Sequence, residues 1–497
     1  MRPALLGWVI MILITVSLTS AQNGVNQEMT RKIIDEEQKH SQLMSNFEYM
    51  TDMIGPRLTG SKKLKRANEW MAEKFKEFGC ENVHLEGFEF GRGWQRGIAY
   101  GRLTAPYELQ LDFRALAWTP GTNGLTSGSV LLLTSANDVD KHKGQLKGAF
   151  VLAGPPTNVL PDFEPHARRM RDNEFKEEET SWPNKFSSEE QKTRNEASKQ
   201  SQERREITEK IQQLAKGEQP AVVITDAGRE HSLLNASSGG PRDPKTPEAP
   251  PTVTMPHEHY ALLYRLAKRG ENLRVEMDIK NQFEDDDTKA YNTVAEIRGT
   301  ERPNEVVILG AHLDSWDLGQ GATDNGAGSI IVLEAARILK ALGVQPKRTI
   351  RFILFGGEEQ GLLGSKAYAQ AHESELSKVS GVFVVDTGTG RLRGIGTEGN
   401  EQVIPIFKNL LAPFKSMGLL WVNPRIQIGT DHISFYQKGV PGFAFFQDAI
   451  EYRDKTHHTQ TDTLDKILPD DMKQAATVMA ATAYNVAQLS SMLPRKQ

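Results

Sequence analysis

Histidine and carboxylate residues stand directly after three apolar, strand-like runs of the sequence. The runs at 306–309, 350–355 and 382–385 are followed by His312 and Asp314, by Glu358 and Glu359, and by Asp386. Because the carboxyl ends of parallel strands meet at one edge of a sheet, we expect these side chains to lie close together. Imidazole nitrogen and carboxylate oxygen both bind zinc. Cys80 is the single cysteine, which excludes a cysteine-rich zinc site. These residue types therefore predict a metal site at the sheet edge.

Two further segments add ligands. The glycine-rich segment 319–328 carries Asp324 and can fold this carboxylate back over the sheet edge, and His457 and His458 follow much later. One histidine from the first run, Asp324, one of the paired glutamates, Asp386 and one late histidine make two imidazoles and three carboxylates. Five ligands exceed what one open tetrahedral zinc site requires. A pair of ions that share Asp324 fits better, because each ion then has three protein ligands and both act on one water molecule.

The adjacent residues Glu358 and Glu359 suit two different tasks. Neighbouring residues point in different directions, so one carboxylate can bind a metal ion while the other stays free as a proton shuttle. A carboxylate beside the attacking water can accept its proton and pass it to a leaving amine. The pair therefore favours metal-assisted hydrolysis.

Two aspartates are spaced to support the histidines. Asp314 lies two residues after His312, and Asp462 lies four residues after His458. Each is expected to accept the second N–H group of its imidazole and so to fix the tautomer. Taken alone, each candidate has an ordinary explanation; Asp324, for example, is more often a helix cap. The coincidence of all of them at strand ends favours the joint metal site.

Alternating strands and helices must position these residues. After residue 293 the strand-like runs alternate with helical segments at 328–342 and 361–372, and another strand is expected at 439–446. Upstream, Ser61 is expected to cap a helix whose apolar residues recur at three- and four-residue spacing. The alternation predicts an α/β fold with a mainly parallel central sheet flanked by helices.

A smaller β-rich insert interrupts this domain. We assign residues 22–124 to the first part of the main domain, 125–284 to the insert and 285–497 to the second part, which carries the metal site. Four short apolar runs, at 130–133, 149–153, 221–225 and 273–279, are separated there by polar stretches; a strand is also expected at 108–116 in the first part. A charged arm at about 165–219 is either a solvated face or a partner-docking arm.

Composition excludes several classes of protein. Sixty Lys and Arg against 64 Asp and Glu leave a net charge of −4, so no nucleic acid partner is expected. Arg2, the apolar run 4–18 and the small residues 19–21 predict a signal peptide at 1–21, with a retained membrane anchor as the alternative. We therefore expect export to a periplasmic or extracellular location, with no stable membrane partner after cleavage.

The motifs together resemble the M28 family of zinc exopeptidases. The likeness rests on AHLDS at 311–315, GATDN at 321–325, EE and GLLGS within 358–365, the isolated Asp386, and a late histidine with Asp462 four residues on. Residues 54–61, IGPRLTGS, also look like a segment of that family. The resemblance covers about residues 30–120 and 285–490. The insert is similar to a protease-associated domain, an arrangement that occurs in carboxypeptidase Q-like members.

The resemblance implies a role for each candidate. It implies His312 and Asp386 on one Zn²⁺, Glu359 and His458 on a second, Asp324 as the bridge and Glu358 as the catalytic base. His458 is preferred to His457 because of the four-residue step to Asp462. His432 and Tyr436 are alternative donors to the oxyanion.

The implied activity is that of an exported two-zinc exopeptidase acting on short peptides, from the amino end. A carboxypeptidase or dipeptidase is the alternative, because Arg453 and Lys455 precede the late histidines and are placed to hold a substrate carboxylate. More remote alternatives are a glutaminyl cyclase-like acyltransferase with one zinc and a non-catalytic binding protein.

Overall fold

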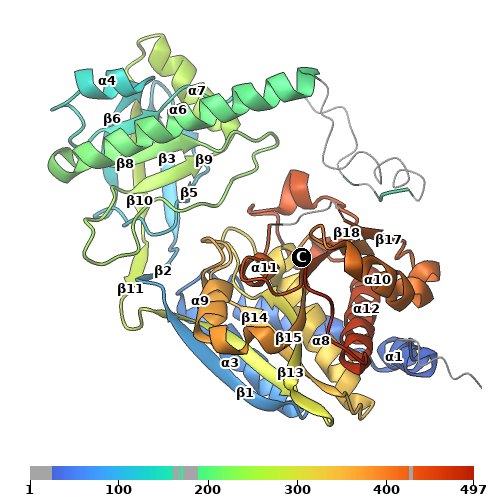
Figure 1. The fold of residues 1–497 in the computed structure, drawn as a ribbon. Coiled ribbons are helices and arrows are strands. Elements are labelled where there is room, and N and C mark those ends of the chain that lie inside the picture. The colour runs from blue at the N-terminus through green and yellow to red at the C-terminus, as the bar shows by residue number, and fades with distance from the viewer. Residues whose placement is uncertain (1–24, 160–166, 168, 172–187, 425–428, 497) are drawn as a thin grey trace, which may run out of the picture.

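The protein is described by a computed structural model, in which residues 25–159, 167, 169–171, 188–424 and 429–496 are placed. The predicted signal peptide lies outside the described residues. Within these ranges, no helix combines the length and the hydropathy that crossing a membrane requires. Figure 1 shows a main domain and a separate, smaller insert above it.

The main domain is built on an eight-stranded sheet with the order β1-β12-β14-β13-β15-β18-β16-β17. Its central strands β14, β13, β15 and β18 are parallel to one another, whereas β1, β12 and β16 each run antiparallel to the inner neighbour. The strands are β1 Glu81–Glu89, β12 Lys289–Ile297, β13 Arg302–His312, β14 Arg348–Phe355, β15 Val379–Val385, β16 Leu392–Gly396, β17 Trp421–Asn423 and β18 Gly442–Gln447. A sheet with a parallel centre confirms the predicted α/β class.

Helices cover both faces of this sheet. One face carries α1 (Gln27–His40), α2 (Leu43–Glu48), α3 (Lys62–Glu77), α8 (Ala327–Ala341), α10 (Ile404–Leu411) and α12 (Pro469–Gln488), and the other carries α9 (Leu363–Ala371) and α11 (His432–Tyr436). Helix α8 is buried along nearly its whole length because α12, α1 and α2 pack around it. As predicted, the Ser61 hydroxyl caps α3 by accepting the N–H of Leu64.

The insert is built on a second eight-stranded sheet, of order β4-β3-β10-β6-β7-β8-β9-β5. Its elements are β3 Ala99–Ala105, β4 Leu109–Gln110, β5 Arg114–Ala115, β6 Thr126–Leu133, α4 Ala136–Lys141, β7 Phe150–Ala153, α6 Ser188–Glu218, β8 Val222–Asp226, β9 Thr252–Met255, α7 His257–Lys268 and β10 Arg274–Ile279. The single strand predicted at 108–116 is instead two short strands.

The predicted boundary at residue 125 is wrong. Strands β3, β4 and β5 precede it and pair inside the sheet of the insert. The insert therefore begins just after β1, and it ends just before β12, which is the neighbour of β1 in the main sheet. A short ribbon of β2 (Gly93–Gln95) and β11 (Gln282–Glu284) lies at this junction. The glycines at 91, 93 and 97 mark a turn at this junction, but a turn does not show that the strands after it pair in a different sheet.

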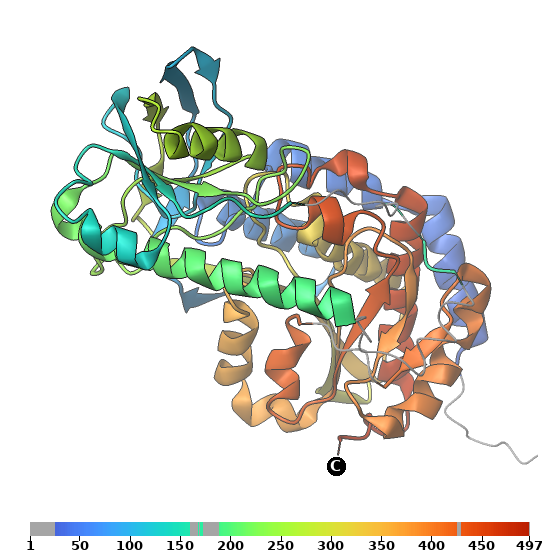
Figure 2. The same ribbon diagram turned by 90° about the horizontal axis from the view of Figure 1, so that it is seen from above.

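The predicted charged arm is only partly described. Its C-terminal part forms the long helix α6, and Figures 1 and 2 show this helix projecting from the insert above the strands of the main domain. Of its N-terminal part, Arg169 contacts the main domain through Asp448, directly after β18, and Asp471, in the first turn of α12. The insert is thus attached to the main domain at more than the chain junction.

Candidate metal centre

The carboxyl ends of β13, β14 and β15 bring three of the predicted residues together. The Nε2 atom of His312 lies 3.2 Å from Oδ1 of Asp386 and 4.0 Å from Oε2 of Glu358. One ligand atom from each of these residues lies within 4.8 Å of the others, which is close enough to hold one ion. Parallel neighbours end at the same edge of the sheet, and this edge is the site that the sequence predicted.

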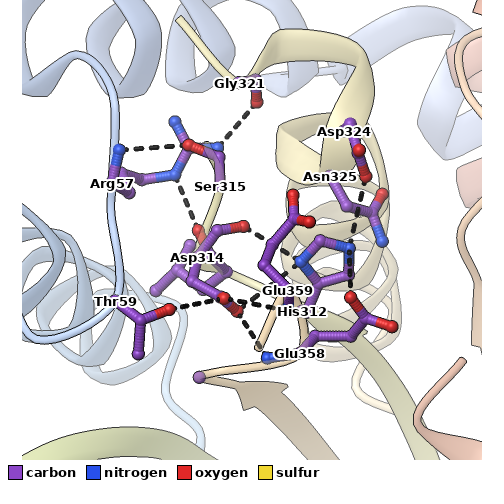
Figure 3. Close-up of polar contacts among 12 residues, drawn as sticks. Arg57, Thr59, His312, Asp314, Ser315, Gly321, Asp324, Asn325, Glu358 and Glu359 are labelled. Atoms are coloured by element: carbon purple, nitrogen blue, oxygen red, sulfur yellow. Dashed lines mark hydrogen bonds and ion pairs between the residues drawn. The ribbon is translucent and has the colours of Figure 1, made fainter. Parts of the chain in front are cut away.

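Asp324 lies between two histidines. Its Oδ1 is 3.4 Å from Nε2 of His312, and its Oδ2 is 3.2 Å from Nε2 of His458. The glycine-rich turn that carries Asp324 leads into α8, where Asn325 accepts the N–H of Gly328 through Oδ1. Because Asn325 caps the helix, the carboxylate of Asp324 is free to face the site (Figure 3).

His458 completes the second half of the cluster. Its Nε2 lies 2.9 Å from Oε2 of Glu359. The ring of His457 stacks on that of His458 with centroids 3.7 Å apart, and its Nε2 lies 3.8 Å from Oδ2 of Asp324. Both late histidines therefore border the same carboxylate, and His458 is the nearer.

The electrostatics of the cluster fit divalent cations. Burial opposes a charge on His458, yet the carboxylates of Asp324 and Glu359 raise its pKa to about 10. Burial and the nearby Asp324 raise the pKa of Glu359 to about 7, and Oε1 of Glu359 is buried without a hydrogen-bond partner. Carboxylates crowded in a buried site need positive charge beyond two imidazoles. The donor set of imidazole and carboxylate matches zinc.

Asp314 supports the site in a different way from the one predicted. Nδ1 of His312 lies 2.9 Å from the backbone oxygen of Asp314, whereas the carboxylate is 3.6 Å away. That carboxylate accepts hydrogen bonds from the hydroxyl of Thr59 and from the backbone N–H groups of Glu358 and Glu359 (Figure 3). Asp314 thus fixes His312 through its backbone and fixes the glutamate turn through its side chain.

The prediction that Asp462 supports His458 is corrected. The carboxylate of Asp462 accepts the backbone N–H of Thr323 at 2.5 Å and that of Asp324 at 3.2 Å. The four-residue step from His458 therefore brings Asp462 to the glycine-rich turn, where it holds Asp324. Burial, together with Asp324, raises the pKa of Asp462 to about 7.

Arg57 is a supporting residue to which sequence reasoning gave no role. Its buried guanidinium donates to the backbone oxygens of Leu313, Gly321, Gln320 and Gly55. Figure 3 shows the contact with Gly321. It therefore ties the exit of β13 to the turn that carries Asp324. The only signal in the sequence was its position in the family-like segment 54–61.

The predicted oxyanion donors both contact Glu398. Nε2 of His432 is 3.1 Å from Oε1 of Glu398, and the hydroxyl of Tyr436 donates to the backbone oxygen of Glu398. Tyr436 also accepts a hydrogen bond from Lys496. His432 and Tyr436 thus share Glu398 as a partner, and their assignment as oxyanion donors stays a prediction. Arg453 is exposed on the surface.

Tyr452 is the residue that sequence reasoning missed. Burial, followed by the charges of Asp324, Asp386 and Glu359, raises its pKa well above the ordinary value for tyrosine. Its phenol therefore stays protonated among the candidate ligands. Its ring lies 5.0 Å from that of His457, between centroids. Its place five residues before His457 was the available signal, but the turn that brings it inward is a tertiary feature.

Comparison with known proteins places this site in a family. Residues 292–483 match Peptidase family M28. Carboxypeptidase Q of Bos taurus is 32% identical over 450 residues, which cover 90% of this chain and 85% of the relative. The crystal structure of a Peptidase M28 precursor from Shewanella amazonensis SB2B has a TM-score of 0.71 at 26% identity, over 95% of this chain and 99% of that one. BSAP, a zinc aminopeptidase from Bacillus subtilis, shares the fold, with a TM-score of 0.58 at 18% identity over 89% and 93% of the two chains.

Proposed function

Because this chain belongs to peptidase family M28 and is a zinc-dependent metallopeptidase, we propose that it is a two-zinc exopeptidase that releases terminal residues from short peptides. The observation that carries the two-ion proposal is the position of Asp324, with one carboxylate oxygen toward His312 and the other toward His458. A carboxylate in this position bridges two ions that share a substrate.

The distances support one assignment of ligands. His312 and Asp386 would hold the first ion, Glu359 and His458 would hold the second, and Asp324 would contribute to both. Asp314 and Asp462 hold these ligands in place through the bonds described above. Zinc, when bound, makes a coordinated water more acidic and polarises the carbonyl of a substrate.

Glu358 is the proposed proton carrier. It is less buried than Glu359, with 14% of its side chain exposed against 2%. Burial raises its pKa well above the ordinary value, an effect that His312 opposes and Asp386 reinforces. A carboxylate with increased proton affinity accepts a proton from the attacking water and then passes it to the departing amine. The phenol of Tyr452 is the proposed donor to the oxygen that becomes negative.

The direction of attack has two candidates. The resemblance implies an aminopeptidase. Carboxypeptidase Q of Bos taurus is a sequence relative over 90% of the chain, whereas the aminopeptidase from Bacillus subtilis is similar in fold alone. The long match to a carboxypeptidase Q supports a carboxypeptidase or dipeptidase activity as the second candidate. The rival one-zinc acyltransferase is disfavoured by the full set of five ligands.

Metal analysis combined with blocked substrates tests the proposal. We expect two zinc ions for each chain, and hydrolysis of a free dipeptide that is lost with a chelator and restored by zinc. An aminopeptidase accepts the amidated dipeptide and rejects the acetylated one, whereas a carboxypeptidase does the reverse. A chain that holds two zinc ions but hydrolyses none of these peptides contradicts the proposed activity.

Export and the nature of the insert belong to the same proposal. The predicted signal peptide supports secretion, and the sequence of the insert supports its likeness to a protease-associated domain. Detection of a mature amino terminus near Gln22 in the medium or periplasm tests the first. The family supports a peptide substrate, and the net charge of −4 does not favour a nucleic acid partner.

A further inference from the structure

The insert is hydrogen-bonded to the loop that carries His457 and His458. A segment between β8 and β9, Arg229–Ala236, makes four hydrogen bonds to residues 454–460 of the main domain. They join Arg229 Nη2 to the oxygen of Asp454 at 2.6 Å, Leu234 N to Oε1 of Gln460 at 2.8 Å, Nε2 of Gln460 to the oxygen of Ser232 at 2.9 Å, and Ala236 N to the oxygen of His458 at 2.8 Å. We call the segment 229–236 the clamp.

The clamp acts on a histidine whose backbone needs support. His458 has a φ of +60°, in the left-handed region that non-glycine residues seldom adopt. Its backbone oxygen is held in this conformation by the N–H of Ala236. Its ring meets the indole of Trp316 edge to face, with centroids 6.0 Å apart, and Trp118 of the insert backs that indole at 6.2 Å. The insert therefore restrains both the backbone and the ring of His458.

Gln460 is the link between the two parts. It lies two residues after His458, and its carboxamide both accepts from Leu234 and donates to Ser232. Because both ends of the amide are engaged, its orientation is fixed by the insert. Substitution of a residue that orients a metal ligand weakens metal binding about 10- to 100-fold.

We propose that Gln460 is a positioning residue and that the clamp sets His458 for zinc, so that binding of the ion held by Glu359 and His458 depends on the docked insert. This rests on the ligand assignment in the proposed function. Under this proposal the insert contributes to the geometry of the metal centre and does not merely lie beside it. His312 and Asp386, which would hold the other ion, make none of the four bonds of the clamp, so binding of that ion should not depend on it.

Zinc titration of the metal-free, full-length protein tests the clamp from both sides. Gln460→Ala, in the main domain, removes two of the four hydrogen bonds, and Arg229→Ala, in the insert, removes one. In both variants we expect the dissociation constant of one ion to rise about 10- to 100-fold while that of the other ion is unchanged. Gln460→Glu keeps the acceptor for Leu234 and is expected to lie between the parent and Gln460→Ala. Peptide hydrolysis by Gln460→Ala should recover as zinc is added in excess.

Gln488→Ala is the matched control, because Gln488 also makes a long-range hydrogen bond, to the oxygen of Gln345, at the far end of α12. It should bind both ions with parental affinity. If Gln460→Ala and Arg229→Ala bind both ions as the parent does and lose only thermal stability, the clamp has no positioning role. A parent chain that binds fewer than two ions would instead contradict the two-ion proposal itself.

Discussion

Single residues of the same type take different roles in this site because of their immediate partners. Glu358 and Glu359 are adjacent, and both donate their backbone N–H to Asp314. Glu359 then reaches Nε2 of His458 at 2.9 Å, whereas Glu358 stays 4.0 Å from Nε2 of His312. The turn that Asp314 fixes therefore separates Glu359, the proposed ligand, from Glu358, the proposed proton carrier.

Glu358→Gln tests this separation. The amide keeps the volume of the side chain and cannot accept the proton, so kcat should fall about 10²- to 10⁴-fold. Zinc content should remain at the parental value, because the ligands of the proposed ions are unchanged. Glu375→Gln, at an exposed position, serves as the control. Turnover at the parental rate in Glu358→Gln, measured with a dipeptide substrate, would contradict the assignment.

Tyr452→Phe separates the tyrosine near the candidate ligands from Tyr436, one of the two alternative donors that the sequence suggested. Loss of the phenol hydroxyl among Asp324, Asp386 and Glu359 should lower kcat about a hundredfold, as the loss of an oxyanion donor does. Tyr436→Phe is the matched control and should keep the parental kcat, because its hydroxyl contacts Glu398 and Lys496 instead. Steady-state kinetics of both variants measure the effect, and a parental kcat in Tyr452→Phe would exclude the role of Tyr452.

The clustering of the candidate site residues was predictable from the sequence, whereas several contacts that hold them were not. His312, Glu358 and Asp386 follow apolar strands, so the sheet geometry alone brings them together. The partner of Asp462 depends on where the loop after His458 meets the glycine-rich turn, and the inward position of Tyr452 depends on a wide helical turn at Tyr452–Thr456. Neither contact leaves a periodic pattern in the sequence.

At the scale of secondary-structure elements, α1 docks on α8 through buried charges. Glu37 on α1 and Glu334 on α8 are each 1% exposed, and Arg337 is 5% exposed. Arg337 bonds Glu334 at 2.7 Å and lies 3.8 Å from Glu37, which accepts the hydroxyl of Ser41. Burial, reinforced by the charge of Glu334, raises the pKa of Glu37 to about 9.

This pKa predicts a pH-dependent stability. The folded-state value lies above the value of about 4.3 for an exposed glutamate, so the folded state favours protonated Glu37. Its contribution is fully present below about pH 4 and is lost as the pH rises toward 9, at up to about 1.4 kcal/mol for each pH unit. Glu37→Gln should therefore be more stable than the parent at pH 8, and the two should converge near pH 4. Denaturant unfolding of both proteins across this pH range measures the difference in stability, and Glu48→Gln, at an exposed position, is the control. A parallel pH dependence in parent and Glu37→Gln would exclude this origin.

Elements with strong periodicity were predicted close to their observed bounds, and the domain boundary was not. Ser61 and the apolar spacing after it located α3, and apolar runs located β13, β14 and β15. Strand β3 has the same local character as β1, but its partner, β10, lies far away in the sequence. The choice of sheet is decided by this long-range pairing, which local patterns do not encode.

At the scale of the whole molecule, Arg169 anchors the arm of the insert on the main domain. Its Nη1 lies 2.6 Å from Asp471 and 3.2 Å from Asp448, two carboxylates that are 3% and 0% exposed. The backbone N–H of Met170 also donates to Asp448. Arg391 and Arg393 approach the same carboxylates only at 3.5 and 3.6 Å. Arg169 is therefore their nearest cation among the described residues.

Arg169→Ala should lower the free energy of unfolding by roughly 1–3 kcal/mol, because it leaves two buried carboxylates with weaker compensation. Because Arg391 and Arg393 remain near these carboxylates, the loss of stability should be smaller than for a buried charge without any compensation. Chemical denaturation at low and at moderate salt measures the change. Lys199→Ala, at an exposed position on α6, is the control. Unchanged stability in Arg169→Ala would mean that the contact contributes nothing in solution.

The pairing of β1 with β12 also bears on how the chain reaches its native state. Glu89 lies opposite Lys289, so β1 and β12 pair although the entire insert separates them in the sequence. Closing so long a loop is slow when the intervening chain is random, although its entropic cost grows only with the logarithm of loop length. Once the insert has folded, its two ends emerge side by side, and β1 and β12 meet as the arms of a hairpin do. Early folding of the insert is thus expected to accelerate assembly of the main sheet, and substitutions that delay the insert should slow recovery of zinc-dependent hydrolysis after dilution from denaturant.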